Sequence, residues 1–299
     1  MLRYRKKWKV VVVMNFIPYA CILVAAIFWG TTGTLQTFLI GDISPISIAA
    51  VRSFIGGSIL LAYVIITKKL RLRKWSWKWT FLAALFIGLF QTAFFTSVQL
   101  TGVAIGTVVT IGSAPIFAGL VEWILFKYKP TSTWGIATFL AIIGVCLLFV
   151  QTDASIVNIK GVILGLIAGF LFACYTNFSK KLTEQQPTLP AVAMTFTICS
   201  LFLMPFGALD GFAWVLEKQN FFVMGIMAIA TTTIAYVLFL TGLKKVSSSA
   251  AVTLSLAEPL TAALLSVIIV KEHLPVVSWV GVLCILTGIF VITCMKQKT

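Results

Sequence analysis

Acidic residues and histidine are scarce in this chain of 299 residues, which contains eight Asp and Glu side chains and one His. The single histidine, His273, lies in a loop, so a histidine-based metal site has almost nothing to be built from. The apolar segments contain no H-E-x-x-H, Ser/His or paired-Asp arrangement, and the chain has no phosphate-binding P-loop. These absences argue against an enzyme and against ATP-driven transport, and predict neither a cofactor nor a metal.

Charge of either sign is sparse overall, because charged residues make up 10 % of the chain and hydrophobic residues 60 %. The mean hydropathy of +1.06 excludes an ordinary soluble domain. A net charge of +15 would suit a nucleic-acid-binding protein, but the cations lie in short loops between apolar runs, so no nucleic-acid partner is expected. Six cysteines lie within apolar segments without close pairing, and we interpret them as packing residues: Cys21, Cys146, Cys174, Cys199, Cys284 and Cys294.

The apolar runs predict ten transmembrane helices, since a bilayer span requires about 20 mostly apolar residues. Val10 to Phe16 has the character of a signal-peptide core, but no cleavage site follows, so we expect an uncleaved start. The predicted spans are Pro18–Ile40, Ile46–Thr67, Thr80–Leu100, Val103–Phe126, Trp134–Gln151, Val162–Ser179, Pro190–Leu209, Phe222–Leu243, Ser249–Val270 and Val276–Met295.

The distribution of cations supports this count. With a cytoplasmic N-terminus, nineteen of the 23 Lys and Arg residues lie on the inner side, three lie outside and Arg52 lies within a span. The inner set is Arg3, Arg5, Lys6, Lys7, Lys9, Lys68, Lys69, Arg71, Arg73, Lys74, Lys78, Lys127, Lys129, Lys180, Lys181, Lys244, Lys245, Lys296 and Lys298, and the outer set is Lys160, Lys218 and Lys271. The bias predicts that both termini are cytoplasmic.

The stretch from Ser247 to Val270 is long enough to span a bilayer, yet it contains Glu258 followed by Pro259. At a rise of about 1.5 Å per residue, Glu258 lies about 14 Å from Ser249, close to the midplane. A carboxylate at that depth costs at least about 2.5 kcal/mol, so Glu258 is expected to face protein or a wet cavity. Pro259 removes a helical hydrogen bond and is predicted to break the helix there.

Gly102 to Phe126 repeats this design. A shift of 144 residues places Pro115 on Pro259 and Gly144 on Gly288, although Ala114 stands where Glu258 would be. Five spans per copy is an odd number, so the copies insert with opposite orientations. The sequence therefore predicts an all-α membrane protein of two inverted five-helix repeats, residues 1–151 and 152–299, with the substrate site at their interface near the midplane.

Several short motifs occur in a characteristic order along the chain. They are F-W-G at Phe28–Gly30, S-P at Ser44–Pro45, V-R-S-F at Val51–Phe54, A-E-P-L at Ala257–Leu260, K-E-H-L at Lys271–Leu274, and Gly281 in the last span. With the ten spans and the repeat, they resemble the EamA-type members of the drug/metabolite transporter superfamily. The resemblance implies alternating-access transport of small metabolites, often amino acids and frequently outward, across a bacterial cytoplasmic membrane. Members often carry a Lys shortly after the W-G pair, where this chain has Gln36.

Two charged side chains within the spans are candidates for binding substrate. Glu258 is predicted to bind a proton or a substrate ammonium, and the alternative is a structural carboxylate beside the helix break. Arg52 lies about 9 Å into its span, where it could hold a substrate carboxylate in a bidentate fork. For Arg52 we expect loop contacts or an outward-extended side chain instead. Glu122, beside Lys127, is expected at the membrane interface.

Neutral residues complete the list of candidates. Trp29, Tyr175 and Tyr236 either line the cavity or anchor spans at the interface. Polar sets at Thr31, Thr32 and Thr34, at Gln91, Thr92 and Thr96, and at Thr231, Thr232 and Thr233 are the remaining cavity candidates, with Gln91, Thr92 and Thr232 as the central members; Pro115 and Pro259 are the predicted helix breaks.

The favoured hypothesis is a non-ATP exporter of small amphipathic or zwitterionic metabolites, coupled to a proton or driven by the substrate gradient, in a lipid bilayer and as a monomer or homodimer. A phosphorylated or nucleotide-sugar substrate would require several cations at membrane depth, where the sequence offers only Arg52. A passive channel or scaffold is the third alternative, and the proline-broken repeated helices favour a moving transporter over it.

Overall fold

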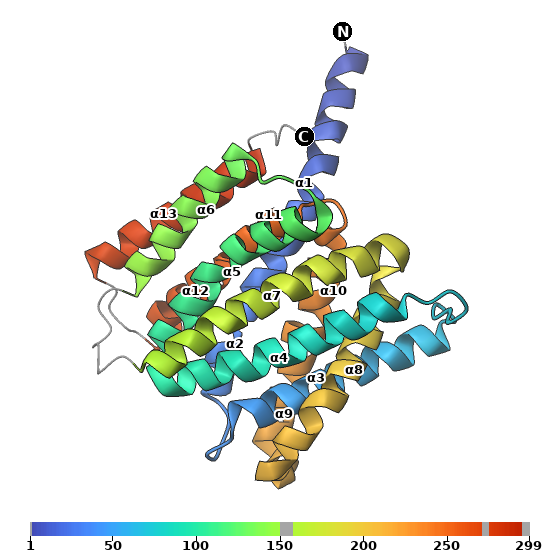
Figure 1. Cartoon of the computed structure of the whole chain (residues 1–299), viewed down its shortest axis with the longest axis vertical. Coiled ribbons are helices and arrows are strands. Elements are labelled where there is room, and N and C mark those ends of the chain that lie inside the picture. Colours follow the sequence, from blue (N-terminus) through green and yellow to red (C-terminus); the bar gives the residue numbers. More distant parts are fainter. Residues whose placement is uncertain (1, 150–157, 271–274, 295–299) are drawn as a thin grey trace.

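The computed structural model describes residues 2–149, 158–270 and 275–294, whose regular structure is entirely helical (Figure 1). The first repeat comprises α1 (Leu2–Gly30), α2 (Thr32–Gln36), α3 (Pro45–Ile66), α4 (Trp77–Thr101), α5 (Val103–Phe126) and α6 (Ser132–Leu148). The second comprises α7 (Ile159–Gln185), α8 (Thr188–Gly207), η1 (Ala208–Asp210), η2 (Ala213–Leu216), α9 (Lys218–Met227), η3 (Ala228–Ile234), α10 (Ala235–Leu243), α11 (Ser248–Leu254), α12 (Ala257–Leu265), η4 (Ser266–Val270) and α13 (Val276–Cys294).

These elements form the ten predicted spans. α9, η3 and α10 follow one another without a gap as the eighth span, and α11, α12 and η4 form the ninth. Within the described residues, nine helices are long and apolar enough to cross a membrane, and Ser132–Leu148 is a shorter apolar helix. The predicted span ends at Gln151 and Met295, the boundary between residues 151 and 152, and the Lys271–Leu274 motif with His273 lie outside the described residues.

Successive connections lie at alternate ends of the bundle. At one end, the loop after α3 contacts the end of α7, where Ser76 Oγ hydrogen-bonds with Gln185 Oε1 at 2.5 Å. At the other end, the loop before α3 contacts the start of α9, where Asn220 Nδ2 donates to Ile40 O at 3.0 Å. The spans therefore run up and down as the charge distribution predicts.

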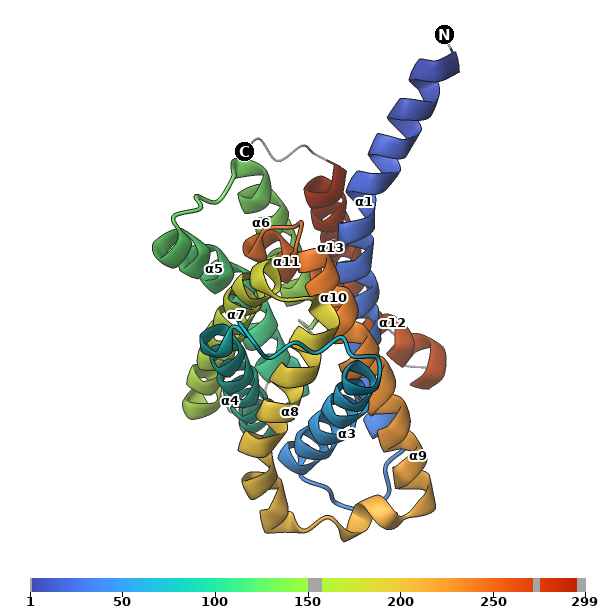
Figure 2. The same cartoon turned by 90° about the vertical axis from the view of Figure 1, so that its right-hand side faces the viewer.

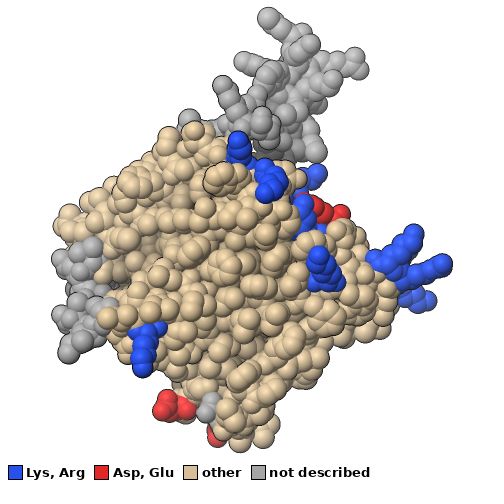
Figure 3. Space-filling model, in the orientation of Figure 1, with Lys and Arg blue, Asp and Glu red and all other residues tan. Residues whose placement is uncertain are grey.

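The two ends differ in charge. The first of them, which we call the Lys-rich end, carries the loops after α3, α5, α7 and α10, with Lys68, Lys69, Arg71, Arg73, Lys74, Lys78, Lys127, Lys129, Lys180, Lys181, Lys244 and Lys245. Among the described residues, the opposite end carries only Lys160 and Lys218 as cations. In Figure 3 most basic side chains lie at the upper and right-hand edges, and the right-hand group marks the loop after α3.

Packing follows the inverted repeat. The helix pairs α3 with α8 and α6 with α13, which are equivalent elements of the two copies, lie side by side in Figures 1 and 2. The contact of α4 with α7 has its counterpart in the contact of α10 with α1, and that of α5 with α7 in α12 with α1. A two-fold relation that exchanges the copies therefore accounts for the main interfaces.

Gly144 on α6 and Gly288 on α13 make equivalent close contacts, each with the backbone of the other helix. A Cβ on Gly144 would lie 2.6 Å from Gly281 O, and a Cβ on Gly288 would lie 2.7 Å from Ala137 O. Adding 144 to residues 137 and 144 gives 281 and 288, so these two contacts are equivalent under the predicted shift. Small residues are needed here because the backbones touch directly, as is usual between membrane helices.

The pair α3 and α8 shows the same reciprocity. A Cβ on Gly57 would lie 2.8 Å from Thr197 N, and a Cβ on Gly207 would lie 3.3 Å from Ser47 Cα. Both contacts obey a shift of 150 residues rather than 144, since the loops between the spans differ in length. The α3–α8 contacts thus also follow the inverted repeat, although the shift of 144 residues found in the sequence does not relate them.

The close contact of Gly144 with α13 can be tested with two substitutions on α6. We expect Gly144→Val to destabilise the fold by about 1–3 kcal/mol, because its side chain would overlap the α13 backbone. A Cβ added to Gly135, also on α6, would have no neighbour within 4 Å, so Gly135→Val is the matched control. Thermal unfolding of the purified protein in detergent measures both; equal midpoints for the two variants would contradict the packing described above.

Candidate functional site

Arg52 lies in the interior, on the face of α3 that packs against α8 and η3. The side chain is 8 % exposed; Nη2 donates to Gln91 Oε1 at 3.1 Å and Nη1 to Thr231 Oγ1 at 3.4 Å. The expectation that Arg52 orients loops or extends to the outer surface is therefore wrong. Two polar acceptors on α4 and η3 give the guanidinium partners inside, so its side chain does not need to reach water.

The positive charge of Arg52 is only partly compensated. Its Nε is buried without a hydrogen-bond partner, and the sole salt bridge among the described residues joins Lys181 to Glu184 at the surface. A buried charge without a paired opposite charge is unfavourable. The site therefore has unused capacity to bind an anionic group.

Glu258 supplies a negative charge to the same region from the other repeat. It lies in the first turn of α12, and its carboxylate is near enough to Arg52 for the two charges to interact. The distance between their N and O atoms nevertheless exceeds the 4.0 Å limit of a salt bridge, and no described residue donates a hydrogen bond to the carboxylate. The side chain is half-buried. Opposite charges thus share one site without direct pairing.

The break in the ninth span positions Glu258. α11 ends at Leu254 and α12 begins at Ala257, two residues before Pro259. Just before the break, Thr253 Oγ1 donates to Ser249 O and Ser255 Oγ to Ala251 O, both at 3.0 Å. Such hydroxyl bonds to the preceding turn bend helices.

Pro115, the other predicted break, does not interrupt its helix, because α5 runs from Val103 to Phe126. The positions equivalent to Thr253 and Ser255 are Val109 and Ile111, which have no hydroxyl to bond to the preceding turn. The break is thus specific to the second repeat, where the carboxylate lies.

A π-helical segment, η3, joins three spans at the site. Thr231 O accepts a hydrogen bond from Trp29 Nε1 at 3.1 Å, and Thr233 Oγ1 donates to Gly56 O at 3.2 Å. With the bond from Arg52, Thr231 therefore contacts both α1 and α3. π-Helical turns are frequent at functional sites because they redirect backbone groups.

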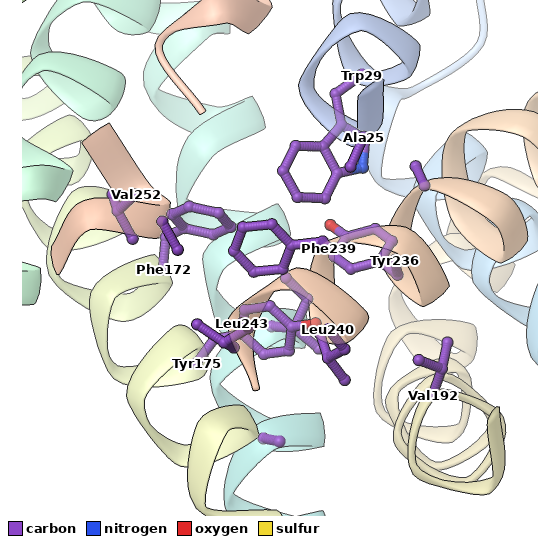
Figure 4. Close-up of a cluster of buried hydrophobic side chains, with 14 of the residues drawn as sticks. Ala25, Trp29, Phe172, Tyr175, Val192, Tyr236, Phe239, Leu240, Leu243 and Val252 are labelled. Carbon is purple, nitrogen blue, oxygen red and sulfur yellow. The ribbon is translucent and has the colours of Figure 1, made fainter. Parts of the chain in front are cut away.

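Aromatic rings pack together in the interior, and we call this cluster the aromatic wall (Figure 4). The ring of Trp29 lies 4.8 Å from that of Tyr236 and 5.1 Å from that of Phe239, and Phe196 lies 4.3 Å from Tyr236 on the other side. All four side chains are buried, and Tyr236 is close to Arg52. Trp29 and Tyr236 consequently belong to the interior rather than to the membrane interface.

The remaining candidate residues lie around the centre formed by Arg52, Glu258 and the aromatic rings. Gln91 is 2 % exposed and is part of it, whereas Thr92 Oγ1 is bonded to Gly88 O in the preceding turn of its own helix. Thr232 packs against Gly56, and its hydroxyl has no partner. Tyr175 lies 6.0 Å from Tyr236, on the side of the Lys-rich end. No described group of three or more His, Cys, Asp and Glu side chains could hold a metal ion.

Sequence reasoning did not single out two residues that contact this centre. Thr232 was preferred to its neighbour Thr231, since the π-helical turn that places Thr231 against Arg52 has no clear sequence signal. Cys199 Sγ lies 3.6 Å from Gln91 Nε2. A cysteine in an apolar run gives no indication that it touches a polar site.

Comparison with known proteins gives a consistent picture. The profile of the EamA-like transporter family matches residues 16–150 and 159–294. The chain is 42 % identical over 280 residues to "Uncharacterized transporter YwfM" of Bacillus subtilis (strain 168), covering 93 % of this chain and 95 % of that protein. "Uncharacterized inner membrane transporter YicL" of Salmonella typhimurium is 25 % identical over 93 % of this chain and 95 % of its own length. "Protein PecM" of Dickeya dadantii is 27 % identical over 88 % of each chain.

A solved structure named "Crystal structure of protein" superposes with a TM-score of 0.80, at 15 % identity, over 92 % of this chain and 95 % of that one. At that level of identity the similarity concerns the fold alone.

The bond between Arg52 and Gln91 leads to a stability prediction. Gln91→Leu removes an acceptor from a buried guanidinium, so we expect a loss of about 1–3 kcal/mol in the free energy of unfolding. Gln99 is exposed on the same helix, which makes Gln99→Leu the matched control with little expected change. Thermal unfolding in detergent compares them; a Gln91→Leu midpoint equal to that of Gln99→Leu would show that the bond contributes nothing.

Proposed function

This chain belongs to the EamA-like transporter family of the drug/metabolite transporter superfamily, and on that premise we propose that it exports a small zwitterionic metabolite, such as an amino acid, by alternating access. It is an integral membrane transporter and not an enzyme. The observation that carries the proposal is the unpaired, opposite charge of Arg52 and Glu258 in one interior site.

The two charges suit a ligand that carries both signs. A substrate carboxylate would bind Arg52, whose Nε lacks a partner, and a substrate ammonium would bind Glu258. Binding of both groups would compensate two charges that the protein itself leaves unpaired. The site is less suited to a phosphate ester, because Arg52 is the only Lys or Arg among the described residues that lies in the middle part of a span.

The aromatic wall would receive the apolar part of such a substrate. Trp29 and Tyr236 lie beside the charged pair, and their rings pack on Phe172, Phe196 and Phe239. Aromatic surfaces of this kind bind apolar groups and also cations. The combination favours an amphipathic zwitterion over a strongly hydrated polar solute.

The membrane and the orientation follow from charge and similarity. The Lys-rich end is assigned to the cytoplasm by the positive-inside rule, so both termini are cytoplasmic. The name of the Salmonella relative includes "inner membrane transporter", which supports a bacterial cytoplasmic membrane for this chain as well. No P-loop is present in the sequence, so the driving force is an ion gradient or the substrate gradient.

Glu258 is the proposed point of proton coupling. The charged and titratable groups that face it are Arg52 on α3, Tyr236 on α10 and, through Arg52, Cys199 on α8. A carboxylate that alternates between binding a proton and binding an ammonium would exchange the two across the membrane. Export of a zwitterion against proton entry is the cycle that this arrangement supports.

Transport by reconstituted protein tests the proposal. In proteoliposomes we expect exchange of labelled amino acids that is competed by zwitterions, but not by the matched amine or the matched carboxylic acid alone. Glu258→Gln should abolish the pH dependence of transport, and Arg52→Gln should lower the rate about tenfold or more, since a charge-assisted hydrogen bond contributes about 1.5–3 kcal/mol.

Surface residues provide the matched controls for these two variants. Glu184 and Lys181 form an exposed ion pair at the Lys-rich end, so Glu184→Gln and Lys181→Gln remove the same charges away from the site. Both should transport like the parent. A Glu258→Gln protein with unchanged rate and pH response would reduce Glu258 to a structural residue beside Pro259, and the substrate site would then be sought elsewhere.

A further inference from the structure

Buried hydroxyl groups without adequate partners extend from the site towards the Lys-rich end. On α7, the hydroxyl groups of Tyr175 and of Ser179, one turn further on, are both buried without a hydrogen-bond partner. On α11, the Ser248 hydroxyl is buried with no partner. A buried polar group without a hydrogen bond is unfavourable, so the three that lie on these two neighbouring helices need a reason.

The ninth span differs in burial between its two halves. All seven residues of α11, Ser248 to Leu254, are buried, whereas Thr261 to Val267 are half-buried without exception. Seven consecutive residues cover every face of a helix, so the second half is not closely surrounded on any side. The ninth span is therefore tightly surrounded at α11, at the Lys-rich end, and less tightly over residues 261–267, towards the opposite end.

Two charged side chains hold the closed end together. Glu122 Oε1 and Oε2 accept hydrogen bonds from Ser248 N at 2.9 Å and Ser249 N at 3.0 Å, respectively. Glu122 is 4 % exposed, so its carboxylate is held inside the protein at this end of the bundle. The backbone amides that begin α11 need acceptors, and a carboxylate supplies two at once.

Lys180 binds the same turn from its other side. Its Nζ donates to Leu243 O at 3.0 Å and to Val246 O at 2.5 Å, at the end of α10. The charges of Lys180 and Glu122 are also near enough to interact. The turn between α10 and α11 is thus fixed by α5 through Glu122 and by α7 through Lys180.

We infer that the path from the Arg52–Glu258 site to the Lys-rich face runs between α7 and the α10–α11 turn, past Tyr175, Ser179 and Ser248, and that Glu122 and Lys180 close it. Separation of α5 and α7 from α11 and from the turn before it would expose the three unpaired hydroxyls to water or substrate. Their new hydrogen bonds would offset the loss of the Glu122 and Lys180 contacts. The inference rests on the alternating access proposed above.

A cysteine at the buried position 179 reports whether this path is open. We place Ser179→Cys in the otherwise intact chain and apply a membrane-impermeant maleimide to each face of membrane vesicles separately. Intact-mass measurement gives the number of maleimides bound per chain, and the number bound by the parent chain, which has six cysteines of its own, is subtracted. In the Glu122→Ala and Lys180→Ala backgrounds we expect labelling from the Lys-rich face about tenfold faster or more, because the charge-assisted bonds that favour the closed state are lost.

Glu184→Ala and Lys181→Ala, which remove the same residue types from the neighbouring surface, should leave the labelling rate unchanged. Unchanged labelling in both test backgrounds, or equal acceleration in the controls, would overturn the assignment. If Glu122→Ala does not yield folded protein, Glu122→Gln and Lys180→Ala decide by the same criterion. The labelling needs no substrate, so a failure of amino-acid transport would refute the proposed function and leave this result standing.

Discussion

Water does not reach the interior of a bilayer, so every polar group of this chain that lies there needs a partner within the protein. Most of the structure satisfies that requirement locally. Threonine and serine hydroxyls bond to carbonyls in the preceding turn, as at Thr96, Thr176 and Thr253, and glycines let backbones touch where no side chain would fit. Against this background the few groups that remain unpaired are informative. Arg52 Nε, Tyr175 Oη and Ser248 Oγ are among them.

The features that depend on hydropathy and charge were predictable from the sequence. Ten apolar runs and the bias of lysine and arginine lead to the ten spans, because span length and loop charge are local properties. The shift of 144 residues was visible in Pro115 and Pro259, and the structure repeats it in the contacts of Gly144 and Gly288. Glu258 was identifiable because a carboxylate in the middle of an apolar run is rare.

The features that depend on which side of a helix faces which neighbour were not predictable. Arg52 was expected near the surface, yet Gln91 and Thr231 hold it inside, and these partners are 39 and 179 residues away in sequence. Glu122 was expected at the membrane interface from its distance to the end of its own helix, and nothing in the sequence indicated that it binds the start of α11, more than 120 residues later. The partners of both side chains were missed for the same reason: the pairing of a buried charge is decided by tertiary contacts.

The two repeats differ in the span that contains Pro115 in one copy and Pro259 in the other, and this difference shapes the candidate site. In the first copy α5 is unbroken, and it carries Glu122, which holds the start of α11 in the second copy. In the second copy the equivalent span is broken, carries Glu258 near the break and is bonded at its start to the first copy. A movement of α11 against α5 would displace the start of the span that carries Glu258 ten residues further on. In α5 the hydroxyl bond from Ser113 Oγ to Thr110 O precedes Pro115 and leaves the helix continuous, whereas the bonds of Thr253 and Ser255 before Pro259 accompany a break between α11 and α12.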